Sequence, residues 1–169
     1  LKHEDLAEKK LFYDDALGRE VGTLSSLLSE ERYGHIRTAL KEKGMRSGFT
    51  CLFYGGPGTG KTETVYQLAR QTGRDIVMAD VTKLKSMWVG ESEKNLKSLF
   101  SKYRRLVRDS KVTPILLFNE ADAVFGVRKT GAEDAVDKME NSLQNIILQE
   151  MEDLQGILIA TTNLSENFD

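Results

Sequence analysis

The sequence holds one cysteine, Cys51, and two prolines among its 169 residues. A single thiol excludes intrachain disulfides, cysteine-rich zinc sites and two-cysteine redox motifs, and it fits a reducing compartment. No proline-rich linker, internal repeat or low-complexity tract divides the chain. Apolar runs such as 115–118 are far shorter than the roughly 20 residues that span a bilayer, and residues 1–10 are too charged for a signal peptide. We therefore expect a cytoplasmic protein without membrane contact.

A strong charge of either sign is also lacking, since the net charge is only −2. The sequence shows no polybasic stripe of the kind that binds duplex DNA, so we expect no nucleic-acid partner. The length fits one ordinary domain with one core. The chain begins without Met and stops soon after a strand-like run. We therefore expect it to be a piece of a longer protein.

Two parts follow one another along the chain. Residues 1–45 are expected to be a helical segment that leads into a core, and Ser29 is placed to cap its second helix. Residues 46–169 alternate between short, branched apolar runs and helical periods, which is typical of a parallel sheet covered on both faces. The expected strands are 50–54, 75–80, 113–118 and 156–161, and the expected helices are 61–71, 92–108 and 136–154.

A glycine-rich stretch, GGPGTGKT, follows the first of these strands. Gly55, four residues, and then Gly60, Lys61 and Thr62 match G-x-x-x-x-G-K-[ST], the P-loop pattern. Small residues let successive backbone N–H groups surround phosphate oxygens, and the following helix adds its positive end. Lys61 is then expected to reach the β and γ phosphates, and the Thr62 hydroxyl to bind Mg²⁺. The spacing disfavours a nicotinamide-type dinucleotide site.

Another apolar strand ends in polar residues, in the stretch PILLFNEADAVFG. Asn119 and Glu120 follow this strand directly, at the carboxyl end where open α/β sheets place their ligands. The position predicts acidic chemistry facing the phosphate loop. A solvated loop carboxylate is the alternative for Glu120.

Four motifs together resemble a known family. GGPGTGKT, MWVGESEKNLKSLF, ILLFNEADAVF and ILIATTN, in this order and spacing, resemble the ATPase core of the classical AAA branch of the AAA+ superfamily over about residues 48–163. The resemblance implies a P-loop NTPase fold, which is a three-layer α/β/α arrangement with a parallel sheet in strand order five, one, four, three, two. It also implies ATP or ADP and Mg²⁺ as ligands, and a homo-hexamer that threads a protein substrate through a pore.

The resemblance also implies roles for single residues. Glu120 matches the glutamate that activates the attacking water, and Asn163 matches the sensor residue near the γ phosphate, although strand-ending asparagines are also common in turns. Trp88, Val89 and Gly90 match a pore loop that grips the substrate, although a lone tryptophan can instead be a core residue. The residues expected to contact nucleotide form the phosphate loop and its first helical turn: Gly56, Pro57, Gly58, Thr59, Gly60, Lys61, Thr62 and Glu63.

Two features depart from the family pattern. Asn119 stands where the family has an aspartate beside Mg²⁺, so an oxygen ligand is kept but a negative charge is lost. No arginine follows Arg128, and the chain stops before the family's fifth strand, its arginine fingers and its helical lid. We therefore expect an incomplete core that binds nucleotide with little turnover.

These features leave two functions open. The first is Mg²⁺-dependent ATP hydrolysis that drives protein remodelling or unfolding by a ring. The second is a nucleotide-dependent binding or scaffolding switch without useful turnover, for which Asn119 is the best support. An ATPase that remodels DNA complexes shares the fold, but the Trp-Val-Gly loop and the missing basic face disfavour it.

Overall fold

The computed structural model describes residues 1–81, 83, 92–122 and 135–163. In this part of the chain, four strands alternate with helices, as the sequence predicts. The elements are η1 (His3–Asp5), α1 (Asp15–Leu27), α2 (Glu30–Glu42), β1 (Phe49–Tyr54), α3 (Lys61–Thr72), β2 (Ile76–Asp80), α5 (Ser92–Asp109), β3 (Ile115–Asn119), α7 (Ala135–Glu152) and β4 (Ile157–Thr162).

The sheet has the order β1-β4-β3-β2, and all its neighbouring strands run parallel. The predicted α/β fold with a parallel sheet is therefore confirmed, and its order matches the expected one without a fifth strand. In the described residues β1 and β2 are the two edges. The register aligns Tyr54 with Thr162 and Asp80 with Asn119, so the carboxyl ends of the strands lie side by side.

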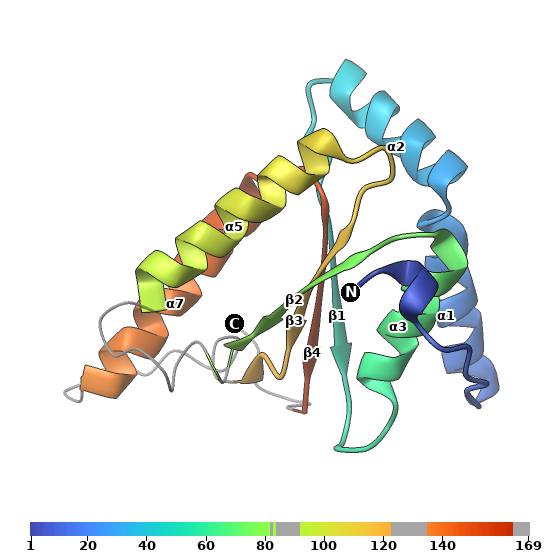
Figure 1. Cartoon of the computed structure of the whole chain (residues 1–169), viewed down its shortest axis with the longest axis horizontal. Helices are drawn as coiled ribbons and strands as arrows, with labels where there is room; N and C mark the ends of the chain where they lie inside the picture. Colours follow the sequence, from blue (N-terminus) through green and yellow to red (C-terminus); the bar gives the residue numbers. More distant parts are fainter. Residues whose placement is uncertain (82, 84–91, 123–134, 164–169) are drawn as a thin grey trace.

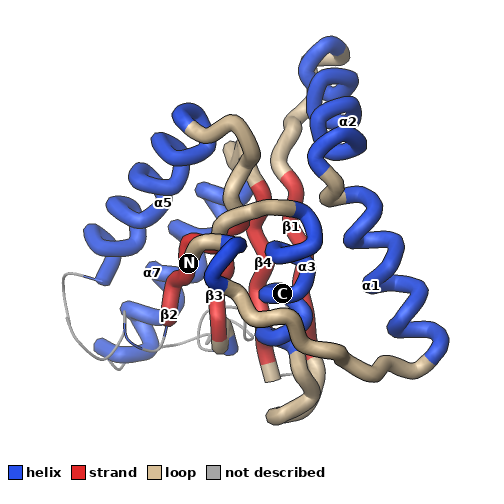
Figure 2. The backbone as a smooth tube through the Cα atoms, turned by 45° about the vertical axis from the view of Figure 1, so that its right-hand side comes forward, coloured by secondary structure: helices blue, strands red, loops and turns tan. Residues whose placement is uncertain are grey.

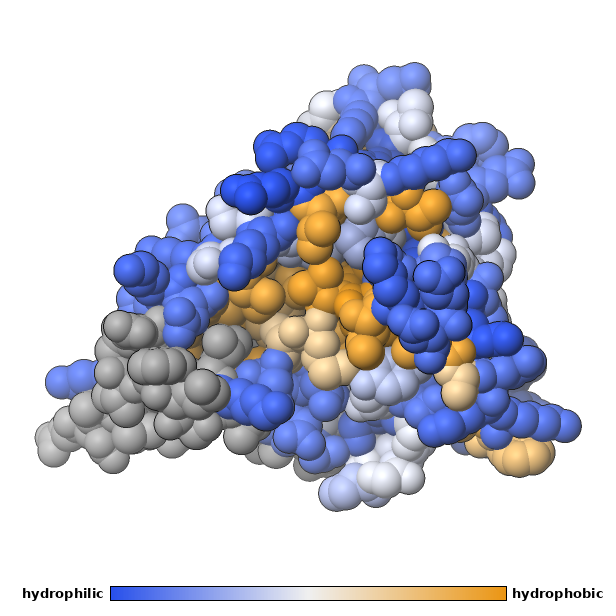
Figure 3. Space-filling model, in the orientation of Figure 1, coloured by the Kyte–Doolittle hydropathy of each residue, from blue (hydrophilic) through white to orange (hydrophobic). Residues whose placement is uncertain are grey.

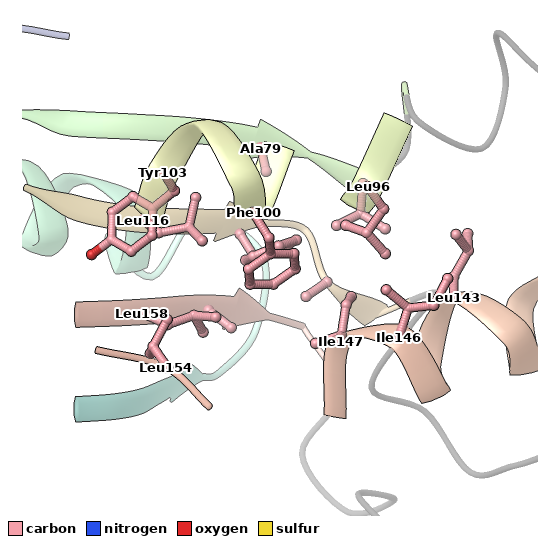
Figure 4. Close-up of a cluster of buried hydrophobic side chains, with 14 of the residues drawn as sticks. Ala79, Leu96, Phe100, Tyr103, Leu116, Leu143, Ile146, Ile147, Leu154 and Leu158 are labelled. Atoms are coloured by element: carbon pink, nitrogen blue, oxygen red, sulfur yellow. The ribbon is translucent and has the colours of Figure 1, made fainter. Parts of the chain in front are cut away.

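Helices cover both faces of the sheet. Figures 1 and 2 show α5 and α7 on one face and α1, α2 and α3 on the other. On α5, the side chains of Leu96, Phe100 and Tyr103 are buried against the sheet. Phe100 stacks on Phe118 of β3 with ring centroids 5.6 Å apart, inside the cluster that Figure 4 draws between α5, α7 and the sheet. Burial of these apolar side chains holds the layers together.

The N-terminal helices show one wrong prediction. Ser29 does precede α2, but its hydroxyl donates to the Ser26 carbonyl at 2.8 Å and makes no capping bond to α2. The side-chain cap occurs one helix earlier, where Asp14 accepts from the Leu17 N–H at 2.7 Å. Gly73 ends α3 in the left-handed conformation, with φ 65°, as expected for a glycine C-cap.

Apolar surface is exposed at one sheet edge. Met78 of β2 keeps 38% of its surface exposed, and Figure 3 shows apolar surface in the middle of the face on which β2 lies. The chain's first residues cover one end of this edge, because Leu1 and Ile76 exchange two backbone hydrogen bonds of 2.8 Å. Among the described helices, none has the length and apolar character needed to cross a membrane.

Candidate functional site

The candidate site lies at the carboxyl ends of β1, β3 and β4. β1 leads into the phosphate loop, β3 into Asn119 and Glu120, and β4 into Asn163. Because β4 lies between β1 and β3 in the parallel sheet, the polar residues at the carboxyl ends of all three strands lie next to one another. This arrangement brings together predicted residues that lie far apart in the sequence.

The phosphate loop has the backbone that a P-loop needs. Gly58 and Gly60 have positive φ values of 72° and 83°, in a region where a side chain would be strained. The Thr59 hydroxyl donates to the Gly56 carbonyl at 2.8 Å, which closes the loop. Gly60 directly precedes α3, so the loop's N–H groups and the amino end of α3 lie together. This geometry favours an anion.

The Lys61 side chain folds across the loop. Its ammonium donates to the carbonyls of Gly55 and Gly56 at 2.8 and 2.7 Å, and to Asn163 Oδ1 at 2.9 Å. The first two contacts hold the cation over the loop, and the third joins it to the end of β4. Lys61 and Asn163, which were each predicted as site residues, are therefore in direct contact.

A second contact joins α3 to β3 and β4. Asn119 Oδ1 accepts from the hydroxyls of Thr62 and Thr161, each at 2.8 Å. Thr161 Oγ1 in turn accepts from the Glu120 N–H at 3.2 Å. Thr161 was not predicted as a site residue, because a threonine inside an apolar strand reads as an ordinary β-branched residue. Here it links Asn119, the last residue of β3, with Glu120, the residue after it.

Glu120 lies at a sharp turn directly after β3. Its φ is 54°, the one positive value outside glycine in the described residues. Such conformations are uncommon for residues with a side chain and occur often at functional sites. The residue is exposed, and within the described ranges no hydrogen bond or ion pair involves its carboxylate. The turn thus presents a carboxylate that is available for chemistry.

Asp122 has a structural role that the sequence did not indicate. Its Oδ1 accepts from the Asn163 N–H at 2.8 Å and from the Thr162 hydroxyl. These bonds tie the turn after β3 to the end of β4. They hold Asn163 and Glu120 in a fixed relation across the two strands.

The family of the chain follows from comparison with known proteins. Residues 51–169 match the family model described as "ATPase family associated with various cellular activities (AAA)". The chain belongs to the AAA family. The match begins in β1 and includes the P-loop, both strand ends and Asn163, so it covers every element of the site just described.

Curated relatives agree with this assignment. The AAA chain is 33% identical over 121 residues to Protein CdcH of Halobacterium salinarum, 32% over 119 residues to Cell division protein C of Sulfolobus acidocaldarius, and 29% over 147 residues to the Proteasome-associated ATPase of Thermobifida fusca. These matches cover 70%, 69% and 76% of the chain. They cover only 15%, 28% and 24% of the relatives' own lengths.

The oxygen donors of the site fit Mg²⁺. Thr62 Oγ1 and Asn119 Oδ1 are hard oxygen donors 2.8 Å apart at the start of α3. No group of three His, Cys, Asp or Glu that could hold a metal occurs among the described residues. A P-loop does not need one, because Mg²⁺ there takes further oxygen ligands from phosphates and water.

A cavity of about 840 Å³ adjoins the phosphate loop of this AAA chain. It lies between α1 and the exposed side of β1, and apolar side chains such as Leu17, Val21 and Phe53 line much of it. Lys61, Thr59 and other loop residues line its other end. The lining is therefore partly apolar, and it also includes the charged residues Arg19 and Glu20 of α1 and Lys61 of the loop.

Three predicted residues fall outside the described ranges. Trp88, Val89 and Gly90, the expected pore loop, belong to the stretch 84–91. Arg128 belongs to the stretch 123–134. Their predicted roles stay predictions.

Proposed function

We propose that this AAA chain binds ATP with Mg²⁺ and hydrolyses it, and that hydrolysis drives the remodelling or unfolding of proteins by a ring-shaped hexamer. The observation that carries the proposal is the 2.9 Å contact between Lys61 Nζ and Asn163 Oδ1. It brings a cation and a polar amide together beside the phosphate loop. Terminal phosphate oxygens need such donors.

The hydrogen bonds of the Lys61 ammonium support phosphate binding. Two of its acceptors are carbonyls of the loop itself, which carry only partial negative charge. Phosphate oxygens carry full charge and form stronger, charge-assisted hydrogen bonds. A triphosphate would therefore draw the ammonium from Gly55 and Gly56 while Asn163 stays within reach.

Glu120 is proposed as the residue that activates water. The oxygen of water would form a bond to the γ phosphorus while the bond from that phosphorus to the β–γ bridging oxygen breaks, which releases ADP. The proton of the water would pass to the Glu120 carboxylate. The bond from the Glu120 N–H to Thr161 holds the backbone of the turn from which this carboxylate projects.

Thr62 and Asn119 are proposed to face Mg²⁺. The ion would neutralise charge on the β and γ phosphates. The Thr62 hydroxyl would offer its oxygen to the ion while it keeps donating its hydrogen bond to Asn119 Oδ1, which is 2.8 Å long in the structure. Asn119 supports this contact without adding charge.

The cavity beside β1 is proposed to take the adenine base. Its apolar walls from α1 and β1 suit a flat heterocycle, and it opens onto the loop that would hold the phosphates. Residues 1–45 would then act as a segment that completes the nucleotide site of the core, residues 46–169.

The ring and its substrate are proposed from the family and from the Trp-Val-Gly motif. Trp88, Val89 and Gly90 would project into a central channel and grip an extended polypeptide. One relative is named a proteasome-associated ATPase, which favours protein over nucleic acid as the substrate. We place this activity in the cytoplasm, since the single cysteine fits a reducing compartment.

By itself the 169-residue chain is proposed to turn over slowly. Phosphoryl transfer in related enzymes gains on the order of 10³ to 10⁵ in rate from an arginine finger. No arginine follows Arg128 in this sequence. Nucleotide binding does not need that arginine and would be retained.

A nucleotide-dependent switch without turnover is the second candidate, and Asn119 favours it because the site lacks the usual carboxylate beside Mg²⁺. The two functions are separated by measuring ATP hydrolysis in the complete protein with and without Asn119→Asp. Turnover by the unchanged protein supports ATP hydrolysis that drives protein remodelling. Absence of turnover, together with its restoration by Asn119→Asp, would rule this function out and support the nucleotide-dependent switch.

A further inference from the structure

An asparagine beside a metal site has two chemically different ends. Its carbonyl oxygen can accept hydrogen bonds and attract a cation, while its NH₂ group donates and repels one. The two ends have nearly the same shape, so rotation by 180° exchanges them without a change in packing. A residue at position 119 can support Mg²⁺ only if the oxygen faces Thr62.

The hydrogen bonds around Thr161 select one of these two orientations. Thr161 is only 2% exposed, and its oxygen accepts from the Glu120 N–H at 3.2 Å. The Thr161 hydroxyl donates to Asn119 Oδ1 at 2.8 Å. If the amide were turned over, its NH₂ group would face the Thr161 hydroxyl, and the hydroxyl proton would lose this acceptor. A buried donor without an acceptor is costly, so the orientation with the oxygen inward is favoured.

The same orientation determines what Thr62 can do. With Oδ1 inward, the Thr62 proton points to Asn119, and the lone pairs of its hydroxyl stay open on the phosphate side. With NH₂ inward, an N–H would occupy a Thr62 lone pair and place a positive dipole end beside the cation. The orientation of one amide therefore decides whether the Thr62 hydroxyl is usable as a ligand of the cation.

We propose that Thr161 is a positioning residue that locks the Asn119 amide with its oxygen toward Thr62, and so lets an asparagine serve at a magnesium site. The inference rests on the proposed binding of Mg²⁺ and nucleotide at the P-loop. A carboxylate presents an oxygen in either orientation and needs no such lock. Thr161 therefore matters for Mg²⁺ when residue 119 is Asn, and much less when it is Asp.

The experiment uses the purified chain and a non-hydrolysable ATP analogue. Calorimetry gives the dissociation constant with Mg²⁺ and with EDTA, and the ratio of the two is the magnesium gain. Thr161→Val removes the hydroxyl at nearly constant shape, Thr161→Ser keeps the hydroxyl, and each is made with Asn119 and with Asn119→Asp. Thr161→Ala repeats the hydroxyl removal if the valine variant does not fold.

We expect Thr161→Val to lower the magnesium gain about tenfold with Asn119, in the range of couplings between contacting residues. Thr161→Ser should keep the gain, and in the Asn119→Asp chain Thr161→Val should change it less than about twofold. An equal loss in both backgrounds would show a merely structural role and overturn the inference, as would no loss with Asn119. Absence of nucleotide binding by the unchanged chain in both conditions would overturn the proposed function and this inference with it.

Discussion

Lys61 and Asn163 are 102 positions apart in the sequence, and their side chains meet at 2.9 Å. The contact depends on the pairing of β1 with β4, which aligns Tyr54 with Thr162. The loop after β1 and the residue after β4 are thereby placed side by side. A phosphate group held by the loop would meet both side chains at once.

Lys61→Met should weaken nucleotide binding. The substitution keeps much of the apolar stem but removes the ammonium that the loop holds at 2.7–2.8 Å from the Gly55 and Gly56 carbonyls. A hydrogen bond to a charged group contributes about 1.5–3 kcal/mol, so the dissociation constant for ATP should rise at least about tenfold. Calorimetric titration measures it, and Lys102→Met on the exposed side of α5 is the control. Equal affinity of both variants for ATP would show that Lys61 does not contribute to nucleotide binding.

Arg74→Met should destabilise the fold. Arg74 is 1% exposed, and its guanidinium donates to the carbonyls of Leu28 and Thr113 at 2.9 and 2.8 Å. It also lies 4.7 Å from the centre of the Tyr33 ring. Burial disfavours the charged form of Arg74 and lowers its pKa. Without the guanidinium, however, the carbonyls of Leu28 and Thr113 would lose a hydrogen-bond donor. We expect a loss of roughly 2–4 kcal/mol in the free energy of unfolding.

Urea unfolding measures this loss, with Arg70→Met as the matched control on α3. The Arg70 side chain makes an exposed ion pair with Glu8 at 3.3 Å, which contributes about 0–1 kcal/mol. If both variants have the same stability, Arg74 does not hold α2 to the sheet as its contacts indicate.

Gly156→Ala should disturb the start of β4. A Cβ at Gly156 would lie 2.3 Å from the Tyr103 hydroxyl oxygen, which bonds the Pro114 carbonyl at 2.7 Å and the Ile157 N–H at 2.8 Å. The clash would displace a buried ring and break bonds that join α5 to β3 and β4. We expect the free energy of unfolding, measured by heat or urea, to fall by about 1–3 kcal/mol.

Gly22→Ala is the matched control for this substitution. A Cβ at Gly22 meets nothing within 4 Å, and alanine favours a helix by about 1 kcal/mol over glycine. The two alanine variants should therefore change stability in opposite directions. A stable Gly156→Ala protein would mean that Tyr103 can move without cost.

Acid should release the first residues from β2. Partial burial of the Asp75 carboxylate would raise its pKa, but hydrogen bonds from the His3 backbone and side chain and from Lys2 outweigh this and lower the pKa from 3.8 to about 2. Because the folded pKa is depressed, the stabilisation is complete above about pH 4. It should be lost as the pH falls toward 2. Amide chemical shifts of Lys2 and His3 would report the transition, and Asp75→Asn should abolish it.

The sequence predicted the elements whose cause is local. The glycines before Lys61 allow positive φ values, and the branched apolar runs favour strands, so the P-loop and the sheet could be placed without a structure. The contact between Lys61 and Asn163 followed only from the order of strands, which the family resemblance supplied. Its physical cause is the sheet and not the local sequence.

The residues that sequence reasoning missed act through contacts between strands. Thr161 has the β-branched shape of an ordinary strand residue, and its role appears only when β3 lies beside β4. Asp122 could be mistaken for a catalytic carboxylate, but its bonds to β4 show that it fixes a turn. Ser29 was predicted to cap α2 by accepting from a helix N–H, but in the structure its hydroxyl donates to the Ser26 carbonyl.

The central claim is that this AAA chain belongs to an ATP-hydrolysing enzyme whose water is activated by Glu120. The most direct measurement compares phosphate release and ATP binding in the complete protein before and after Glu120→Gln. The account predicts that the variant binds ATP as tightly as the unchanged protein and hydrolyses it at least about 10²-fold more slowly. Hydrolysis at an unchanged rate in the variant would contradict it.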